Sequence, residues 1–205
     1  MVLIYLTLCS LIALCWSQTQ PGPQMVRLAA TTDAASMYVQ WSSYDSCSDD
    51  SDAYVMYGMS KDNLDMQTQG ICYNFTYGNP DGLHYIHLVT LADLKERTLY
   101  YYQVKSGGIT LSEVFYFTTL SNDPSFLPNI IYFGDLGHKG GETAHRLFTA
   151  LPAMIEEIHN PSNNLPVDMV IHAGDFAYDL QDNGGINGDD FQRYVQNISA
   201  YVPYM

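Results

Sequence analysis

Alternating apolar and polar positions recur in short runs between about residues 23 and 120 of the chain. In one run Val39 and Trp41 fall on one face, while Tyr38 and Gln40 fall on the other, which is the period of a half-buried strand. Seven segments predict strands: residues 25–30, 37–41, 53–59, 71–77, 83–91, 99–105 and 114–119. This density of short strands indicates an all-β, antiparallel sandwich over residues 23–120.

The periodicity changes after residues 121–124, a polar stretch that we interpret as a linker. Residues 129–133 and 167–173 are apolar runs typical of buried strands, and residues 142–159 place apolar side chains on one helical face. A strand, a helix and a strand in this order predict a βαβ unit with parallel strands. Pro152 is expected to kink or divide the helix.

A loop and a second helix are predicted near the end of the chain. Residues 179–188 are polar and rich in glycine, which is typical of a loop. Asp189 and Asp190 follow as candidate caps, so we expect a helix that runs from them towards Tyr204. Residues 128–205 thus form a second predicted unit.

The N-terminal segment indicates export. Residues 2–16 are apolar and uncharged, yet too short to span a bilayer comfortably, so residues 1–17 are predicted to be a signal peptide. No Lys or Arg follows Met1, and an uncleaved N-terminal anchor is the alternative interpretation. Beyond this segment we expect no stable membrane span.

Two further patterns fit a secreted or endolysosomal protein. Outside the leader only Cys47 and Cys72 remain, a pair suited to one disulfide in an oxidising compartment, with free buried thiols as the alternative. Asn74 and Asn197 each begin an Asn-x-Ser/Thr glycosylation acceptor.

The formal net charge of −14 argues against a nucleic-acid partner, because phosphate backbones are held by Lys and Arg. It leaves a small phosphate substrate open, since a bound metal ion reverses the local field.

Two Gly-Asp pairs follow the predicted buried strands of the second unit. The first lies in Gly134-Asp135-Leu136-Gly137, and the second in Gly174-Asp175-Phe176-Ala177-Tyr178. An aspartate at the carboxyl end of such a strand lies where α/β layers hold ligands and metals. One pair alone is also explained by turn formation and helix capping. On adjacent parallel strands, the two pairs with Tyr178 predict half of a two-metal site.

A fibronectin type III-like pattern is visible in the first unit. Residues 94–100 contain a Leu that closes a loop and Tyr100 at the start of the next strand, and Trp41 ends an early strand. Tyr100 then corresponds to a corner tyrosine whose hydroxyl bonds to the backbone upstream. We expect Trp41 and Tyr100 to pack in the core.

Taken together, these motifs resemble the first two metal motifs of the purple acid phosphatases, within the calcineurin-like metallophosphoesterases. The sandwich is similar to the N-terminal domain of the longer members, and residues 128–205 to the start of the phosphoesterase domain. The resemblance implies that Asp135 binds Fe(III), that Asp175 bridges Fe(III) and a divalent metal (Zn, Fe or Mn), and that Tyr178 binds Fe(III) as tyrosinate. It implies an acid phosphatase that hydrolyses phosphate monoesters with a metal-bound hydroxide as nucleophile.

The remaining motifs of this family do not occur in the chain. They are Gly-Asn-His, Val-x-x-His and Gly-His-x-His, which supply the other metal ligands and the catalytic histidines. We therefore expect a C-terminally truncated chain that is inactive alone, with its catalytic histidines beyond Met205. His138 is not a ligand on the family pattern. His172 is expected to be a hydrogen-bonded core residue, with a position behind the metal ligands as the alternative.

Two other functions stay open. One is a calcineurin-like phosphodiesterase or nucleotide pyrophosphatase, although Tyr178 would then normally be an aspartate. The other is a non-catalytic secreted binding module, which would retain no iron. A homodimer is left open for the full-length form.

Overall fold

The computed structural model describes residues 22–44, 47, 53–76, 84–107, 110–137, 144–160 and 165–205. The predicted signal peptide, residues 1–17, and His138 lie outside the described residues. Within them, no helix is long and apolar enough to cross a membrane.

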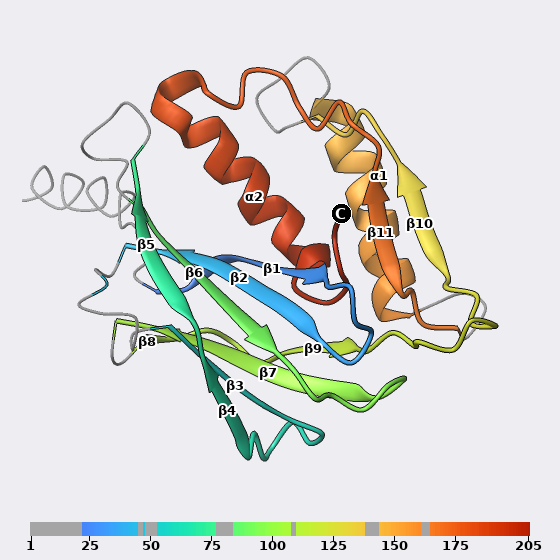
Figure 1. The fold of residues 1–205 in the computed structure, drawn as a ribbon. Helices are drawn as coiled ribbons and strands as arrows, with labels where there is room; N and C mark the ends of the chain where they lie inside the picture. Colours follow the sequence, from blue (N-terminus) through green and yellow to red (C-terminus); the bar gives the residue numbers. More distant parts are fainter. Residues whose placement is uncertain are drawn as a thin grey trace, which may run out of the picture.

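Two antiparallel sheets form the first unit, which confirms the predicted sandwich (Figure 1). One sheet has the order β1-β2-β6-β5, with β1 at Gln24–Ala30, β2 at Met37–Ser43, β6 at His84–Leu91 and β5 at Ile71–Phe75. The other has the order β4-β3-β7-β8, with β9 also paired to β7. Its strands are β4 (Met66–Gln69), β3 (Tyr54–Gly58), β7 (Leu99–Ser106), β8 (Thr110–Leu111) and β9 (Phe115–Thr118). The sequence pattern missed β4 and β8.

Aromatic side chains fill the core between these sheets. Trp41 is fully buried and stacks on His87, with ring centroids 4.9 Å apart. Tyr100 is also buried, and its hydroxyl accepts a hydrogen bond from the Lys95 N–H at 3.0 Å. Both residues therefore have the predicted structural roles.

The second unit contains a parallel pair of strands, β10 (Ile130–Phe133) and β11 (Met169–His172). Between them in the sequence lies α1 (Ala144–His159). This helix continues through Pro152, so of the two predicted outcomes, a kink or a division, the division is wrong. Pro152 is exposed, and water can therefore solvate the carbonyl that loses its helical partner.

The last helix, α2, spans Ile186–Ser199 and follows a 3-10 turn at Asp182–Gly185. The predicted start at Asp189 and Asp190 is wrong, because Gly185 is the N-cap, in a left-handed conformation with φ of 90°. Asp189 lies in the first turn, where a negative charge stabilises a helix without capping it. The helix also ends before Tyr204, since Pro203 favours an extended chain.

Residues 203–205 lie between β11 and β1 as a short parallel strand. The Met205 N–H donates to the Val170 carbonyl at 2.9 Å, and the His172 N–H donates to the Met205 carbonyl at 2.8 Å. On the other side, the Tyr204 N–H donates to the Leu28 carbonyl of β1 at 3.0 Å. The segment therefore joins the sandwich to the sheet of the second unit.

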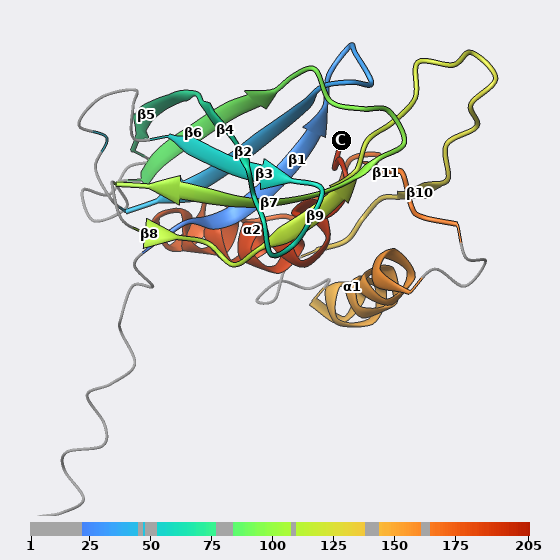
Figure 2. The ribbon, with the colours of Figure 1, turned by 90° about the horizontal axis from the view of Figure 1, so that it is seen from below.

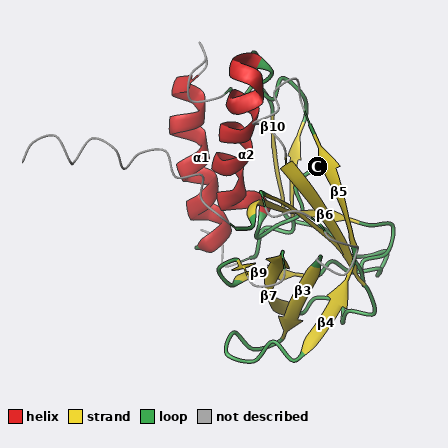
Figure 3. Ribbon diagram, turned by 90° about the vertical axis from the view of Figure 1, so that its left-hand side faces the viewer, coloured by secondary structure: helices red, strands yellow, loops and turns green. Residues whose placement is uncertain are grey.

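Helix α2 covers the edge of the sandwich at β1. Figure 2 shows α2 against the strands and α1 farther out, and Figure 3 shows both helices on one side of the molecule. The Val26 N–H donates to Gln196 Oε1 at 2.9 Å, and the Ser199 hydroxyl donates to the Val26 carbonyl at 3.0 Å. These bonds occupy backbone groups that an edge strand would otherwise expose.

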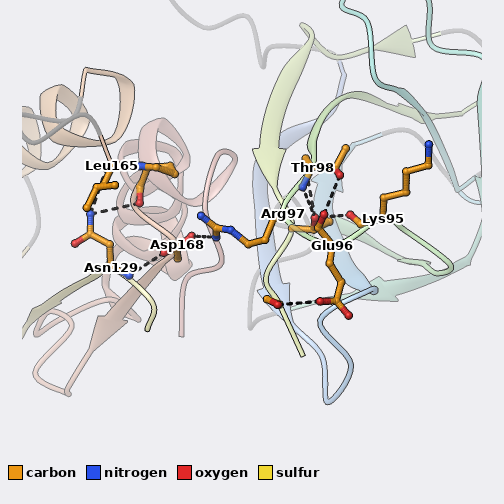
Figure 4. Close-up of polar contacts among 10 residues, drawn as sticks. Lys95, Glu96, Arg97, Thr98, Asn129, Leu165 and Asp168 are labelled. Carbon is orange, nitrogen blue, oxygen red and sulfur yellow. Dashed lines mark hydrogen bonds and ion pairs between the residues drawn. The ribbon is translucent and has the colours of Figure 1, made fainter. Parts of the chain in front are cut away.

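An ion pair fixes the junction between the units (Figure 4). The guanidinium of Arg97, in the loop before β7, contacts the carboxylate of Asp168, just before β11. Asp168 is only 3% exposed and also accepts a hydrogen bond from the Asn129 N–H at 2.8 Å. Arg97 lies 4.6 Å from the centre of the Phe126 ring.

Candidate metal centre

Asp135 and Asp175 follow the carboxyl ends of the paired parallel strands β10 and β11. The register pairs Phe133 with His172, so both loops leave the same edge of the sheet. The loops are bonded to each other: the Asp135 N–H donates to the Gly174 carbonyl at 3.2 Å, and the Gly137 N–H donates to the Phe176 carbonyl at 3.0 Å. The backbone thus holds the two aspartates on neighbouring loops.

Both aspartates have left-handed backbone conformations, with φ of 60° at Asp135 and 49° at Asp175. Gly174 has φ of 98°, a region that side chains rarely adopt, which explains why a glycine precedes Asp175. A non-glycine residue in such a region is strained by about 1–3 kcal/mol, and strain of this kind is concentrated at functional sites.

Tyr178 contacts the second aspartate directly. Its hydroxyl donates a hydrogen bond to Asp175 Oδ1 at 3.0 Å, and the side chain is 61% exposed. Asp175 is exposed and Asp135 is half-buried. The structure therefore brings Asp175 and Tyr178 together and places Asp135 on the adjoining loop, so that three oxygen donors occupy one accessible edge.

His172 lies beneath this edge and is 5% exposed. Its Nδ1 shares a hydrogen bond with the Tyr204 hydroxyl at 2.6 Å. Burial lowers the pKa of His172, while the main chain of Asp175 raises it by a smaller amount. Burial also raises the pKa of Tyr204. The imidazole is thus a hydrogen-bonded buried group, as expected, but it also touches the Asp175 loop.

The aromatic neighbours of His172 were not identified from the sequence. Its ring centroid lies 4.4 Å from that of Phe133 and 4.2 Å from that of Phe176. Tyr204 is 32 positions away in the chain. No local motif links these residues, because their contact depends on the strand register.

The other predicted site residues lie away from this edge, in the sandwich and α2. Cys47 and Cys72 form a disulfide with Cα atoms 6.0 Å apart. His87 Nε2 lies 3.8 Å from Cys72 Sγ, but the disulfide occupies both sulfur atoms. Asn74 is exposed on β5, and Asn197 is exposed on α2, where its amide donates to the Tyr194 carbonyl at 2.9 Å.

The chain is similar to known proteins over most of its length. Residues 23–119 match the family described as the purple acid phosphatase N-terminal domain. Acid phosphatase type 7 of Danio rerio is 33% identical over 185 residues, which cover 89% of this chain and 38% of the relative. The protein of the same name in Homo sapiens is 29% identical over 186 residues, covering 90% of this chain and 39% of the relative.

A solved structure shows the same fold. The purple acid phosphatase from yellow lupin (Lupinus luteus) seeds superposes with a TM-score of 0.66 at 24% identity, covering 90% of this chain and 34% of the lupin chain. The present chain therefore spans well under half the length of the proteins that it matches. By the match of residues 23–119, the chain carries the N-terminal domain of the purple acid phosphatase family.

Proposed function

We propose that this protein is an acid phosphatase of phosphate monoesters, and that this chain carries part of its dinuclear Fe(III)–M(II) site. The observation that supports the proposal most directly is the hydrogen bond between Tyr178 and Asp175, on a loop bonded to that of Asp135. Two carboxylates and a phenol are hard oxygen donors, which fit a trivalent ion. Asp135 and Tyr178 would hold Fe(III), and Asp175 would bridge to the divalent metal.

When bound, a dinuclear centre supplies an activated water and positive charge for in-line attack on phosphorus. The contribution of this chain is to position the ligands. Tyr178 donates its proton to Asp175 in the structure, so it must release that proton before its oxygen can serve as a ligand. We therefore propose that ferric binding releases a proton and weakens as the pH falls.

The chain offers three of the proposed ligands, so we propose that it lacks turnover alone. The test uses the 205-residue chain and the Tyr178→Phe variant, each titrated with Fe³⁺ supplied as its citrate complex. We expect the parent chain to show a visible phenolate-to-iron absorption band that is absent from the variant. We also expect neither protein to hydrolyse p-nitrophenyl phosphate. A colourless parent chain, or an unchanged band in the variant, would remove Tyr178 from the ligand set.

We further propose that the sandwich is of the fibronectin type III kind and that the protein is secreted or endolysosomal. The disulfide between Cys47 and Cys72 supports an oxidising compartment. Expression in a secretory host tests this point, because digestion with an N-glycosidase should increase the electrophoretic mobility of the product. The Asn74→Gln and Asn197→Gln variants would show which acceptor is used.

A further inference from the structure

We propose that His172 is a positioning residue that sets the orientation of the Asp135 and Asp175 loops, which backbone bonds already hold side by side. This inference rests on the proposed function, since it concerns the placement of the same ligands. It assigns to His172 a role in the metal site, although the imidazole itself does not reach the exposed edge.

The imidazole contacts one aromatic ring before the Asp135 loop and one within the Asp175 loop. Phe133 precedes Asp135 by two residues, and its ring centroid lies 4.4 Å from that of His172. Phe176 follows Asp175 directly, and its ring centroid lies 4.2 Å from that of His172. One buried ring therefore contacts a side chain next to each aspartate, so its tilt affects how the two loops are oriented.

A hydrogen bond fixes the rotation of the His172 imidazole. The Tyr204 hydroxyl bonds to Nδ1 at 2.6 Å, and Tyr204 is itself held between two strands by the backbone bonds of residues 203–205. Rotation of the imidazole would break this bond and move the faces that Phe133 and Phe176 contact. The tyrosine thus orients the histidine, and the histidine orients the loops.

The second ring nitrogen is buried as well. His172 Nε2 has no hydrogen-bond partner of standard geometry within the part of the chain that the structure describes, although the main chain of Asp175 lies near enough to raise the pKa of the ring. A buried polar atom without a partner destabilises a protein, so a residue selected only for packing would be apolar here. An imidazole that packs against Phe133 and Phe176 and is also hydrogen-bonded through Nδ1 agrees with a positioning role.

The experiment compares His172→Phe and Tyr204→Phe with the parent chain. The first variant keeps a ring but loses Nδ1, and the second removes only the hydroxyl. His159→Phe is a matched control, because His159 Nδ1 also bonds to a tyrosine hydroxyl, that of Tyr116 at 2.5 Å, and its ring stacks edge-on with Tyr201 at 4.5 Å.

Each protein is titrated with ferric citrate, and the affinity and the energy of the visible absorption band are measured. Loss of a residue that supports metal ligands typically weakens metal binding about 10- to 100-fold. We expect a loss of this size and a shifted band in His172→Phe and Tyr204→Phe, and neither change in His159→Phe. Circular dichroism checks that each variant is folded, and Tyr204→Phe decides the outcome if His172→Phe is not.

The outcomes separate this inference from the proposed function. If the parent chain shows a band that Tyr178→Phe abolishes while Tyr204→Phe and a folded His172→Phe behave like the parent, the positioning role is refuted and the ligand assignment stands. If the parent chain shows no band, the ligand assignment fails and the inference fails with it. An equal effect in His159→Phe would also refute the inference, because it would indicate general destabilisation.

Discussion

The ion pair between Arg97 and Asp168 should be a main determinant of stability at the junction of the two units. In Arg97→Met the side chain keeps an apolar stem but loses the guanidinium, and with it the charge and the contact with Phe126. Asp168, 3% exposed, would then be a buried carboxylate whose remaining partner is the Asn129 N–H at 2.8 Å.

The expected loss of stability follows from how deeply the two side chains are buried. Removing one partner of a buried pair typically costs about 3–5 kcal/mol. Arg97 is itself 36% exposed, so water can partly solvate the site after the change. We therefore expect a loss of about 2–3 kcal/mol in the free energy of unfolding, somewhat below that range. Asp168→Asn leaves no buried charge and should cost about 1 kcal/mol.

A double-mutant cycle in urea measures the interaction between the two residues. The helical circular dichroism signal reports on the second unit, and the fluorescence of buried Trp41 reports on the sandwich. Because the double variant contains no buried charge, it should be about as stable as Asp168→Asn alone. The coupling energy would then be about 2–3 kcal/mol, as large as the whole loss expected for Arg97→Met.

The pair of Arg193 and Asp190 is a matched control. Arg193 has the same 36% exposure as Arg97, but Asp190 is 48% exposed. Such surface pairs contribute about 0–1 kcal/mol. If the coupling of Arg97 with Asp168 is no larger than that of the control pair, burial of the carboxylate does not determine the stability of the junction.

Three further predictions concern stability. Above about pH 10 the free energy of unfolding should fall. Burial raises the pKa of Tyr201 to about 12 and that of Tyr102 well above its usual value, so the unfolded chain loses these protons first. Urea midpoints that stay constant from pH 9 to 11 would contradict this. Replacing both Cys47 and Cys72 by Ser opens a loop with a sequence separation of 25 and should cost about 3.5 kcal/mol in the chain-entropy model; an unchanged urea midpoint would refute that contribution. Tyr100→Phe removes the bond to the Lys95 N–H and should cost about 1 kcal/mol, whereas no loss would show that the bond is replaced by water.

The strands that the sequence predicted best are those with one buried face. In β2, Met37, Val39 and Trp41 are all buried, so the period of two is clear. The missed strand β4 reads Met-Gln-Thr-Gln and has no fully buried residue, so it lacks that signal. The division expected at Pro152 failed for a related reason, because tertiary packing holds α1 together on either side of an exposed proline.

The candidate site was predictable where its chemistry is local in the sequence. The Gly-Asp pairs identify both loops, and Tyr178 lies three positions after Asp175 and within its reach. The environment of His172 was not predictable, because Phe133 and Tyr204 come from other strands. Only the parallel register of β10 with β11, and of β11 with residues 203–205, brings them to the imidazole.

The short strand at residues 203–205 connects the two units through backbone hydrogen bonds. It is bonded to β1 of the sandwich on one side and to β11 on the other, so it joins the units rigidly. A displacement of β1 can pass through Tyr204 to β11 and so to the base of the Asp175 loop. The sandwich can therefore influence the geometry of the candidate metal centre without contributing any of its proposed ligands.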